Sequence, residues 1–272
     1  MSSSRLPVHF ISHGGGPWPW LKKEMPFYDK LEEALKEIPR ELACLPKGIV
    51  VITAHWEEDN FTISANSRPP MLYDYGGFPK HTYEVKYEAE GDEKVAKKIQ
   101  KMVEDQGIKL ELDYKRGFDH GTFVPLFVMY PNANIPIIQI SIKKGYDPKE
   151  HIDFGKALAP LRNENILIIG SGLSYHNIQG LAGGTSSVTE DSKLFDNWLQ
   201  NSLINRSAAE REAELINWAQ APCALAAHPT EDHLVPLFVA VGAAEQSTAS
   251  LKYHEENFFN KVYVSGFRFK DC

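Results

Sequence analysis

Cysteine is scarce in this sequence. Three residues, Cys44, Cys223 and Cys272, occur in 272, and no two of them form a CxxC pair. An odd, sparse set of thiols offers no disulfide framework and is typical of proteins in a reducing compartment. Residues 1–7 lack the apolar core of a signal peptide, and no apolar run is long enough to span a bilayer. We therefore predict a cytoplasmic protein without a membrane partner.

Runs of basic residues are also missing. The chain has 29 Lys and Arg against 36 Asp and Glu, a formal net charge of −7, and its basic residues are scattered. This balance argues against a nucleic-acid partner. The content of 43% hydrophobic and 24% charged residues is typical of a soluble globular protein. Because no linker or composition break divides the chain, we predict a single domain over residues 1–272.

Short apolar runs alternate with segments of helical spacing. Unbroken runs predict strands buried on both faces, as in a parallel sheet, over residues 8–12, 49–56, 135–142 and 166–169, the second of them ending at His55. Residues 61–64 predict a more exposed strand, and 263–269 a closing strand. Helices are predicted over residues 29–38, stopping at Pro39, and over 92–106, 148–161, 189–203 and 208–218. The alternation predicts an α/β fold with a mixed, mainly parallel central sheet flanked by helices.

Histidines stand at the ends of three of these runs. His13 follows the first run, His55 ends the second, and His176 follows the run over 166–171 through a short turn. Ligands of open α/β proteins gather at the carboxyl ends of the strands. These three imidazoles are therefore expected in one crevice.

Two further histidines share a local pattern. His120 follows Asp119 and His233 follows Asp232, and a Val-Pro-Leu-Phe-Val run comes soon after each pair. Both segments predict a helix start with proline in its first turn. The positive partial charge of a helix N-terminus keeps a nearby imidazole neutral. Residues 69–79, rich in aromatics, Gly and Pro, predict a lid or binding wall.

Five of the ten histidines share a strand end or a helix start, and the other five, His228 among them, do not. We expect ordinary structural roles for His9, His254 and His151, the last on a helix surface, while His81 is left open between a pocket wall and the surface. The five that share strand ends or helix starts are His13, His55, His120, His176 and His233. Neutral imidazole is the commonest protein metal ligand, and nitrogens without cysteine suit Zn, Fe, Cu or Ni. No HExxH occurs, which excludes the zinc-protease helix.

Three classes of function compete at this point. His13 followed by three glycines is similar to the oxyanion loop of lipases, but the nearest nucleophile elbow, residues 172–176, has His176 in place of the second glycine. A zinc hydrolase with metal-bound water as nucleophile fits the histidines better. A non-catalytic metal-binding protein leaves the extra histidines unexplained.

Six segments, in order, carry a resemblance to a known family. They are Ser12-His13-Gly14, Thr53-Ala54-His55-Trp56, the run Tyr73 to Pro79, Gly117-Phe118-Asp119-His120-Gly121, the run Gly170 to Asn177, and the run His228 to His233. Together they resemble the class III extradiol ring-cleavage dioxygenases, in particular the LigB-like group that includes the DOPA 4,5-dioxygenases. The resemblance runs from about Pro7 to the final strand.

The resemblance implies a role for several residues. His13, His55 and His233 match the metal ligands, with Glu231 or Asp232 as alternatives for the third. His176 matches an acid/base residue that is also a possible fourth ligand, and His120 a residue near substrate and oxygen. Residues matching the substrate pocket are His228, Asp74 and Tyr75, with Tyr73 and Phe78 expected beside them.

The chemistry implied by the resemblance is the opening of a catechol ring, DOPA-like, by O2 to a semialdehyde. Fe(II) is the expected working metal, and Zn(II) is expected in purified or crystallised protein because the Irving–Williams order favours zinc. No organic cofactor is needed. The predicted partners are thus the catechol and O2 alone.

Overall fold

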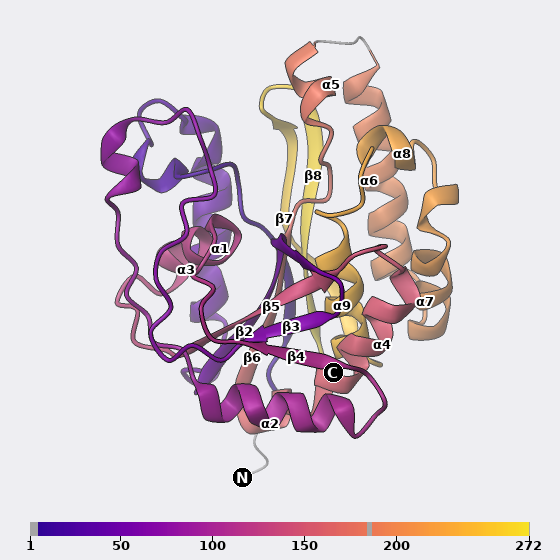
Figure 1. Cartoon of the computed structure of the whole chain (residues 1–272). Coiled ribbons are helices and arrows are strands. Elements are labelled where there is room, and N and C mark those ends of the chain that lie inside the picture. The colour runs from indigo at the N-terminus through magenta and orange to yellow at the C-terminus, as the bar shows by residue number, and fades with distance from the viewer. Residues whose placement is uncertain (1–4, 184–186, 272) are drawn as a thin grey trace.

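One eight-stranded sheet organises the chain in a computed structural model that describes residues 5–183 and 187–271 (Figure 1). The strands are β1 (Val8–Ser12), β2 (Gly48–Glu58), β3 (Phe61–Ser64), β4 (Leu110–Asp113), β5 (Ile137–Lys143), β6 (Ile166–Gly172), β7 (Thr248–Phe258) and β8 (Val262–Lys270). Their spatial order is β4-β3-β5-β2-β6-β1-β8-β7. The central strands β5, β2, β6 and β1 pair in parallel, whereas β8 and β7 join one side and β3 the other in antiparallel fashion. The predicted mixed, mainly parallel sheet is confirmed.

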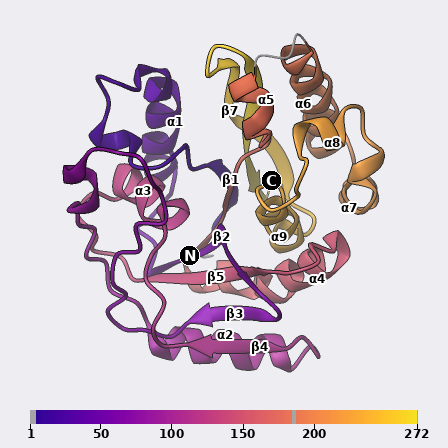
Figure 2. The same cartoon turned by 45° about the horizontal axis from the view of Figure 1, so that its top comes forward.

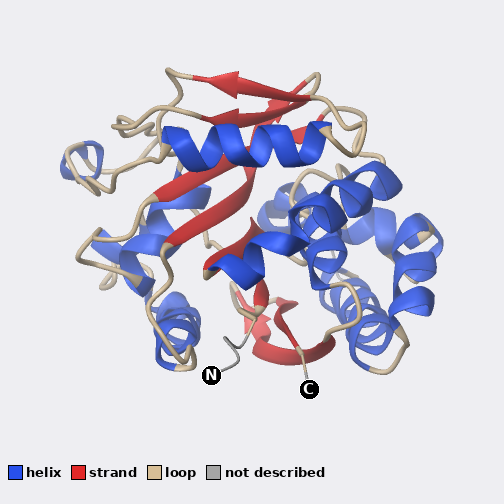
Figure 3. Cartoon of the chain, turned by 90° about the horizontal axis from the view of Figure 1, so that it is seen from below, coloured by secondary structure: helices blue, strands red, loops and turns tan. Residues whose placement is uncertain are grey.

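Helices cover both faces of this sheet (Figures 2 and 3). They are α1 (Asp29–Arg40), α2 (Glu93–Glu104), α3 (His120–Met129), α4 (Pro148–Leu158), α5 (Ile178–Gly183), α6 (Val188–Ile204), α7 (Ala208–Ile216), α8 (Ala224–Ala227) and α9 (Val235–Ala244). Two neighbouring residues of β6 show the layering, because successive strand residues face opposite sides. Gly170 lies against Pro236 of α9, and Ser171 donates to the carbonyl of Gly121 in α3. The central strands are therefore buried on both faces, as their unbroken apolar runs indicate.

Several segment boundaries differ from those predicted. Helix α1 does not stop at Pro39 but continues to Arg40. The proline removes only its own amide donor in the last turn, and the next hydrogen bond of the helix, from Glu41 N–H to the Glu37 carbonyl, still forms at 3.1 Å. Strand β2 continues past His55 to Glu58 after its register against β5 shifts between Ile52 and Glu57. Strands β4 and β7 were not predicted, because they are short or edge segments of mixed polarity.

Strand β3 is buried rather than half-exposed. All four of its residues are buried, and Phe61 stacks on Phe154 of α4 with ring centroids 4.0 Å apart. The alternation of polar and apolar residues is misleading here, because the polar Thr62 is also buried, and its N–H donates to Ser141 Oγ of the neighbouring β5 at 2.9 Å.

No helix among residues 5–183 and 187–271 is long and apolar enough to cross a membrane.

His151 also departs from the prediction of a helix-surface residue. It is fully buried in α4, where Nδ1–H donates to the Asp147 carbonyl at 2.7 Å and Nε2 accepts from Lys143 N–H at 3.0 Å. Burial lowers the pKa of His151 to about 4. The ring is therefore a neutral structural bridge between α4 and β5.

This bridge predicts a loss of stability in acid. Since the pKa of His151 lies below its unfolded value of 6.5, its contribution is present above pH 6.5 and is lost as pH falls toward 4. At about 1.4 kcal/mol per unit, the loss approaches about 3 kcal/mol. Urea unfolding between pH 7.5 and 4 should show a profile for His151→Gln that is flatter by that amount. The exposed-site variant His81→Gln should follow the parent; equal slopes for all three would contradict the assignment.

Candidate metal centre

Five imidazoles converge at the carboxyl end of the parallel strands. His13 follows β1, His55 lies in the irregular part of β2, and His176 follows β6. His120 is the first residue of α3, and His233 lies two residues before α9. The crevice expected from the strand ends is thus formed, and both Asp-His segments contribute to it.

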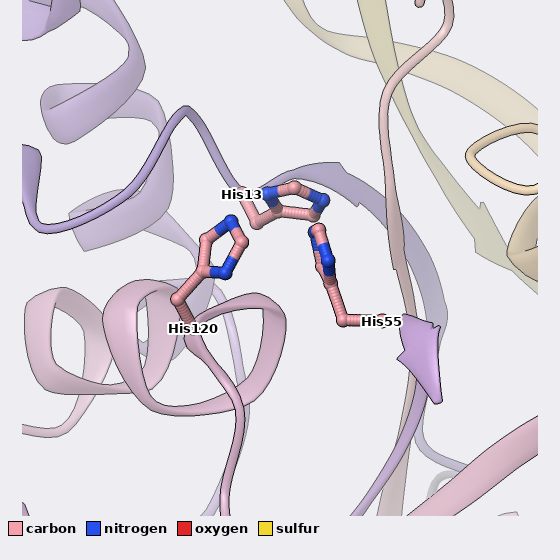
Figure 4. A group of neighbouring side chains, drawn as sticks. All are labelled: His13, His55 and His120. Atoms are coloured by element: carbon pink, nitrogen blue, oxygen red, sulfur yellow. The ribbon is translucent and has the colours of Figure 1, made fainter. Parts of the chain in front are cut away.

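The rings lie close enough to share one ligand. Ring centroids of His13 are 4.8 Å from His55 and 5.2 Å from both His120 and His233. His55 lies 4.0 Å from His120 and 4.9 Å from His233, and its Nε2 is 3.3 Å from Nε2 of His233. His176 stacks on His233 with centroids 3.3 Å apart. Figure 4 shows the rings of His13, His55 and His120 turned toward one another.

A buried polar network shapes β2 around His55. Arg116 Nη2 donates to the His55 carbonyl at 2.7 Å and to Asp119 Oδ2 at 3.2 Å. Asp119, which is fully buried, also accepts from Thr53 Oγ1 at 2.9 Å, and Thr53 Oγ1 accepts from His55 N–H at 3.2 Å. Asp119 Oδ1 caps α3 by accepting from Thr122 N–H as well. The same carboxylate therefore ties the irregular part of β2 to the helix that begins with His120.

Two glycines allow close contacts beside His233 and His13. A Cβ on Gly172 would lie 2.1 Å from the His233 carbonyl, which accepts from Leu173 N–H at 3.0 Å. Gly14 has a φ of +76°, and a Cβ there would lie 2.4 Å from Trp18 Nε1. That indole N–H donates to the His13 carbonyl at 2.9 Å. The glycine turn thus fixes the backbone on which His13 stands.

The hydrogen bonds assign the tautomers of the rings. Nδ1 of His13 is 2.6 Å from the Gly14 carbonyl, which can only accept, so Nδ1 carries the proton and Nε2 the lone pair. Nδ1 of His233 lies 2.5 Å from Asp232 Oδ2 in the same way. Asp74 serves two rings: its Oδ1 is 2.9 Å from Nδ1 of His120, and its Oδ2 is 3.4 Å from Nδ1 of His55. In the three hydrogen-bonded rings, His13, His120 and His233, Nε2 is left with its lone pair.

Electrostatics keep these groups in the states that metal binding requires. Burial, followed by the neighbouring imidazoles, lowers the pKa of His13 and of His55 well below the usual range, so both rings are neutral at pH 7. Burial opposes ionisation of Asp74 and Asp232, but hydrogen bonds from His120 and His233 hold the pKa of each carboxyl low. Neutral imidazoles backed by carboxylates are the usual outer arrangement of a metal–histidine site.

The donor set fits a metal ion. Nε2 of His13 is buried and has no hydrogen-bond partner in the part of the chain that the structure describes. Nε2 of His55 lies 3.3 Å from Nε2 of His233, whose lone pair faces it. Two nitrogens bound to one tetrahedral ion at its usual distance are about 3.4 Å apart. His13, His55 and His120 form one group that could hold an ion, and His176, Asp232 and His233 form another.

A cavity of about 100 Å³ opens beside the rings. Its lining comprises the five imidazoles, Gly14, Gly15, Tyr28, Leu173, Ile178, Leu181, Phe258 and Phe259. The apolar members come from the segment after β6, from α5 and from the turn between β7 and β8. Tyr28 is held by Gly15 N–H, which donates to its hydroxyl at 2.6 Å. A small planar molecule would thus lie between imidazole nitrogens and hydrocarbon.

The aromatic loop forms the outer side of the centre. Tyr75 lies edge-on to His120 at 5.9 Å and donates its hydroxyl to the Thr82 carbonyl at 2.6 Å. Tyr73 donates to the Val85 carbonyl at 2.7 Å, and the ring of Phe78 lies over Gly16. None of Tyr73, Tyr75 or Phe78 lines the cavity beside the imidazoles. Asp74 contacts the rings from behind rather than facing the cavity.

The remaining histidines lie elsewhere. His228 is fully buried between Phe195 and Trp218, with Nε2 2.9 Å from the Ser174 carbonyl, and it lies outside the cavity lining. His81 is exposed. His9 is buried in β1, and His254 lies in β7 with Nδ1 3.1 Å from Ser265 Oγ.

Ser174 does not meet the requirements of a nucleophile. It is only 2% exposed, and its Oγ accepts from Ser265 N–H at 2.8 Å. Its hydroxyl is therefore committed to β8, away from the five rings. The structure removes the serine-hydrolase alternative.

Asp74 provides a prediction about the metal site. Asp74→Asn replaces the acceptor behind His55 and His120 with an amide, so the rings lose their orienting carboxylate. Metal affinity should fall about 10–100-fold, the usual effect of a lost outer partner. Competition with a chelator would measure the change. The control is Asp59→Asn. The Asp59 carboxylate is 85% exposed and pairs with Lys144, so this variant should bind metal as the parent does. Equal metal affinity in the parent and both variants would rule out this role for Asp74.

Sequence reasoning missed the groups that act through contacts distant in sequence. Arg116, which follows Lys115, is an ordinary basic residue in sequence, and its importance lies in reaching the His55 carbonyl. Ile178, Leu181, Phe258 and Phe259 are ordinary apolar residues in sequence. In the structure Phe258 and Phe259 stand at a turn where Phe259 and Asn260 adopt positive φ angles of 51° and 57°, which no pattern in the sequence indicates.

Comparisons with known proteins identify the family of the chain. The family model described as the catalytic LigB subunit of aromatic ring-opening dioxygenase matches residues 8–265. A protein of Beta vulgaris named 4,5-DOPA dioxygenase extradiol is 39% identical over 247 residues, covering 89% of this chain and 88% of its own. Proteins of the same name from Mirabilis jalapa and Escherichia coli K12 are 34% and 31% identical, covering 94% and 89% of this chain and 93% and 87% of their own.

A solved structure supports the fold. An uncharacterized protein of Escherichia coli K12 superposes with a TM-score of 0.78, at 24% identity, covering 97% of this chain and all of the other. The whole sheet with its flanking helices is therefore shared.

Proposed function

Because the chain belongs to the family of aromatic ring-opening dioxygenases defined by the catalytic LigB subunit, and is an extradiol dioxygenase, we propose that its five imidazoles form the centre at which a catechol is opened. Members of this family depend on a non-haem metal ion. The observation that carries the proposal is the facing pair of Nε2 atoms on His55 and His233 beside the unpartnered Nε2 of His13. We further propose that residues 1–272 make up a single catalytic domain.

We assign the metal ligands to His13, His55 and His233, as the motifs suggest. Bound there, the ion would hold catechol and dioxygen together and let charge pass between them. Fe(II) is the proposed working metal, and zinc is the ion that three imidazoles would retain on purification. Asp74 and Asp232 orient the rings by accepting from their Nδ1 atoms.

His176 and His120 are proposed to move protons. Opening the ring requires a base for a catechol hydroxyl and an acid for an oxygen atom, and imidazole can serve as both. His176 stacks on His233 and lines the cavity, which supports the first role for it. His120 is held by Asp74 through both its backbone N–H and Nδ1, so its Nε2 is presented rigidly to the centre. His228, behind the cavity, is more consistent with packing than with substrate contact.

The names of the relatives support a catechol that bears a side chain, with dopa as the reference substrate. The ring would enter the cavity between the imidazoles and the apolar side chains opposite. Both atoms of O2 end in the semialdehyde, so no reductant is consumed. Cys44 and Cys223 are free thiols, which is consistent with the predicted cytoplasmic location.

Metal loading tests this proposal. Metal-free protein is loaded anaerobically with Fe(II), mixed with dopa or another catechol, and exposed to air. The expected result is a yellow semialdehyde, followed by visible absorbance, with one product per O2 consumed.

Zinc-loaded protein is the matched control and should give no colour. Absence of colour with every catechol, together with hydrolysis of an ester or amide by the zinc form, would instead establish a metallohydrolase.

A further inference from the structure

The cavity beside the metal centre has two unlike sides. One is made of imidazoles. The other, here called the apolar wall, consists of Leu173, Ile178, Leu181, Phe258 and Phe259. In the described part of the chain no Lys, Arg, Asp or Glu lines the cavity. The remaining lining residues are Gly14, Gly15 and Tyr28, whose hydroxyl accepts from Gly15 N–H, so a substituent that extends toward the apolar wall meets hydrocarbon.

The wall leaves one apolar side chain, that of Ile178, at the surface, while Leu173 and Phe258 are buried. Ile178 is 56% exposed although it lines the cavity, and no residue of α5 is buried. Exposed apolar side chains gathered at a cavity mark a surface that binds something apolar. Phe259 is fixed in place, since its ring packs on Phe27 at 4.6 Å and on Tyr28 at 5.8 Å.

A hydrogen bond joins the two halves of the wall. Lys261, just after the β7–β8 turn, donates from Nζ to the Leu181 carbonyl of α5 at 2.6 Å. The contact holds the Phe258–Phe259 turn against α5, so the wall is a continuous surface. The ammonium points at a backbone oxygen of the wall and not into the cavity lining.

We infer that the catechol opened here carries an uncharged, apolar substituent, alkyl or aryl, and that the apolar wall selects it. The inference rests on the proposed ring-cleaving function and names its substrate class. A carboxylate or ammonium placed on this wall would lose its hydration without gaining a partner, which is strongly unfavourable. An alkyl chain of the same length would lose only contact with water.

Lys261, a cation beside the wall, offers a rival explanation. An anionic substituent could draw its ammonium away from the Leu181 carbonyl and bind it instead. The two explanations differ in outcome. If the wall decides, removing the Lys261 charge changes acidic and alkyl substrates alike; if the cation decides, it affects the acidic substrate alone.

The test uses two catechols that differ only in charge. 4-Propylcatechol and 3-(3,4-dihydroxyphenyl)propanoate carry chains of equal length, one ending in a methyl group and the other in a carboxylate. With Fe(II)-loaded protein, kcat/KM for the propyl compound should exceed that for the acid by about tenfold or more, the range for a group in a hydrophobic pocket. Dopa should rank with the acid. A preference for the acid or for dopa would overturn the inference.

Binding to the zinc form provides a second readout. Calorimetry on zinc-loaded protein should give the same order of affinities without turnover. If no catechol is opened by the iron form, the proposed function fails, whereas the order of affinities still decides the nature of the wall. A tighter complex with the acid would then overturn the inference independently.

Two variants locate the effect. Ile178→Lys, at an exposed position, places a cation on the wall and should shift the ratio of kcat/KM toward the acid by about tenfold. Leu45→Lys makes the same change at a leucine 59% exposed and outside the cavity, and should leave the ratio unchanged. Lys261→Met should also leave the ratio unchanged. Selective loss of activity toward the acid in Lys261→Met would overturn the inference in favour of the cation.

Discussion

His55→Ala is expected to abolish tight metal binding and, with it, ring opening. His55 forms a nearly equilateral triangle with the other candidate ligands, 4.8 Å from His13 and 4.9 Å from His233 by ring centroids, and its Nε2 lies close to that of His233. Removing it takes away a ligand itself, so affinity should fall by more than the about 10–100-fold lost with an outer partner. The metal content of desalted protein, measured by elemental analysis, should fall from one ion per chain to near zero.

His81→Ala is the matched control for this prediction. It also removes one imidazole, but from an exposed position outside the centre. Its metal content and turnover should equal those of the parent. Normal stoichiometry in His55→Ala would refute the ligand assignment, and circular dichroism of both variants would show that the fold is retained.

The sequence allowed the central fold to be predicted because its strands satisfy a simple rule. β2 and β6 are buried on both faces and contain unbroken runs of Val, Ile and Leu, while the equally buried β5 is rich in Ile although Gln139 and Ser141 interrupt it. β7 fails that rule, since it is an edge strand with few buried residues and its partner β8 lies later in the chain. β3 misleads in the opposite direction, because its polar residues Thr62 and Ser64 look exposed in sequence but are buried, as Phe61 and Ile63 are.

The site was predictable for a related reason. Residues at the ends of parallel strands meet in space whatever loops connect them, so His13, His55 and His176 could be grouped from spacing alone. What spacing cannot provide is the exact course of the chain inside the crevice. His55 reaches the centre through an irregular stretch of β2 held by Arg116 and Asp119, and His233 through backbone contact with Gly172.

The pocket side of the site was the least predictable part. The aromatic loop is conspicuous in sequence, yet its tyrosine hydroxyls are bound to backbone carbonyls, and its contribution to the centre is the carboxylate of Asp74. The cavity instead faces α5 and the β7–β8 turn. Which apolar residues of a chain line a cavity depends on packing between elements distant in sequence, and no local pattern records it.

His176→Ala is expected to reduce turnover about a hundredfold or more while metal remains bound, because the variant loses an acid/base group and keeps His13, His55 and His233. His176 is placed for such a role: it lines the cavity, stacks on His233, and its Nδ1 lies 3.9 Å from Asp232 Oδ2. Steady-state rates with iron-loaded protein would measure the loss. Binding of catechol to the zinc form should stay close to that of the parent.

The metal content of the same variant separates the two roles that the resemblance allows for His176. A residue that only moves protons leaves one ion per chain and reduces kcat, whereas a fourth ligand would lower the metal affinity together with the rate. His176→Gln is a useful companion, since its amide can still pack on His233 and contact an ion but cannot carry a proton at neutral pH. Full turnover in both variants would remove His176 from the chemistry and leave His120 as the remaining proton carrier.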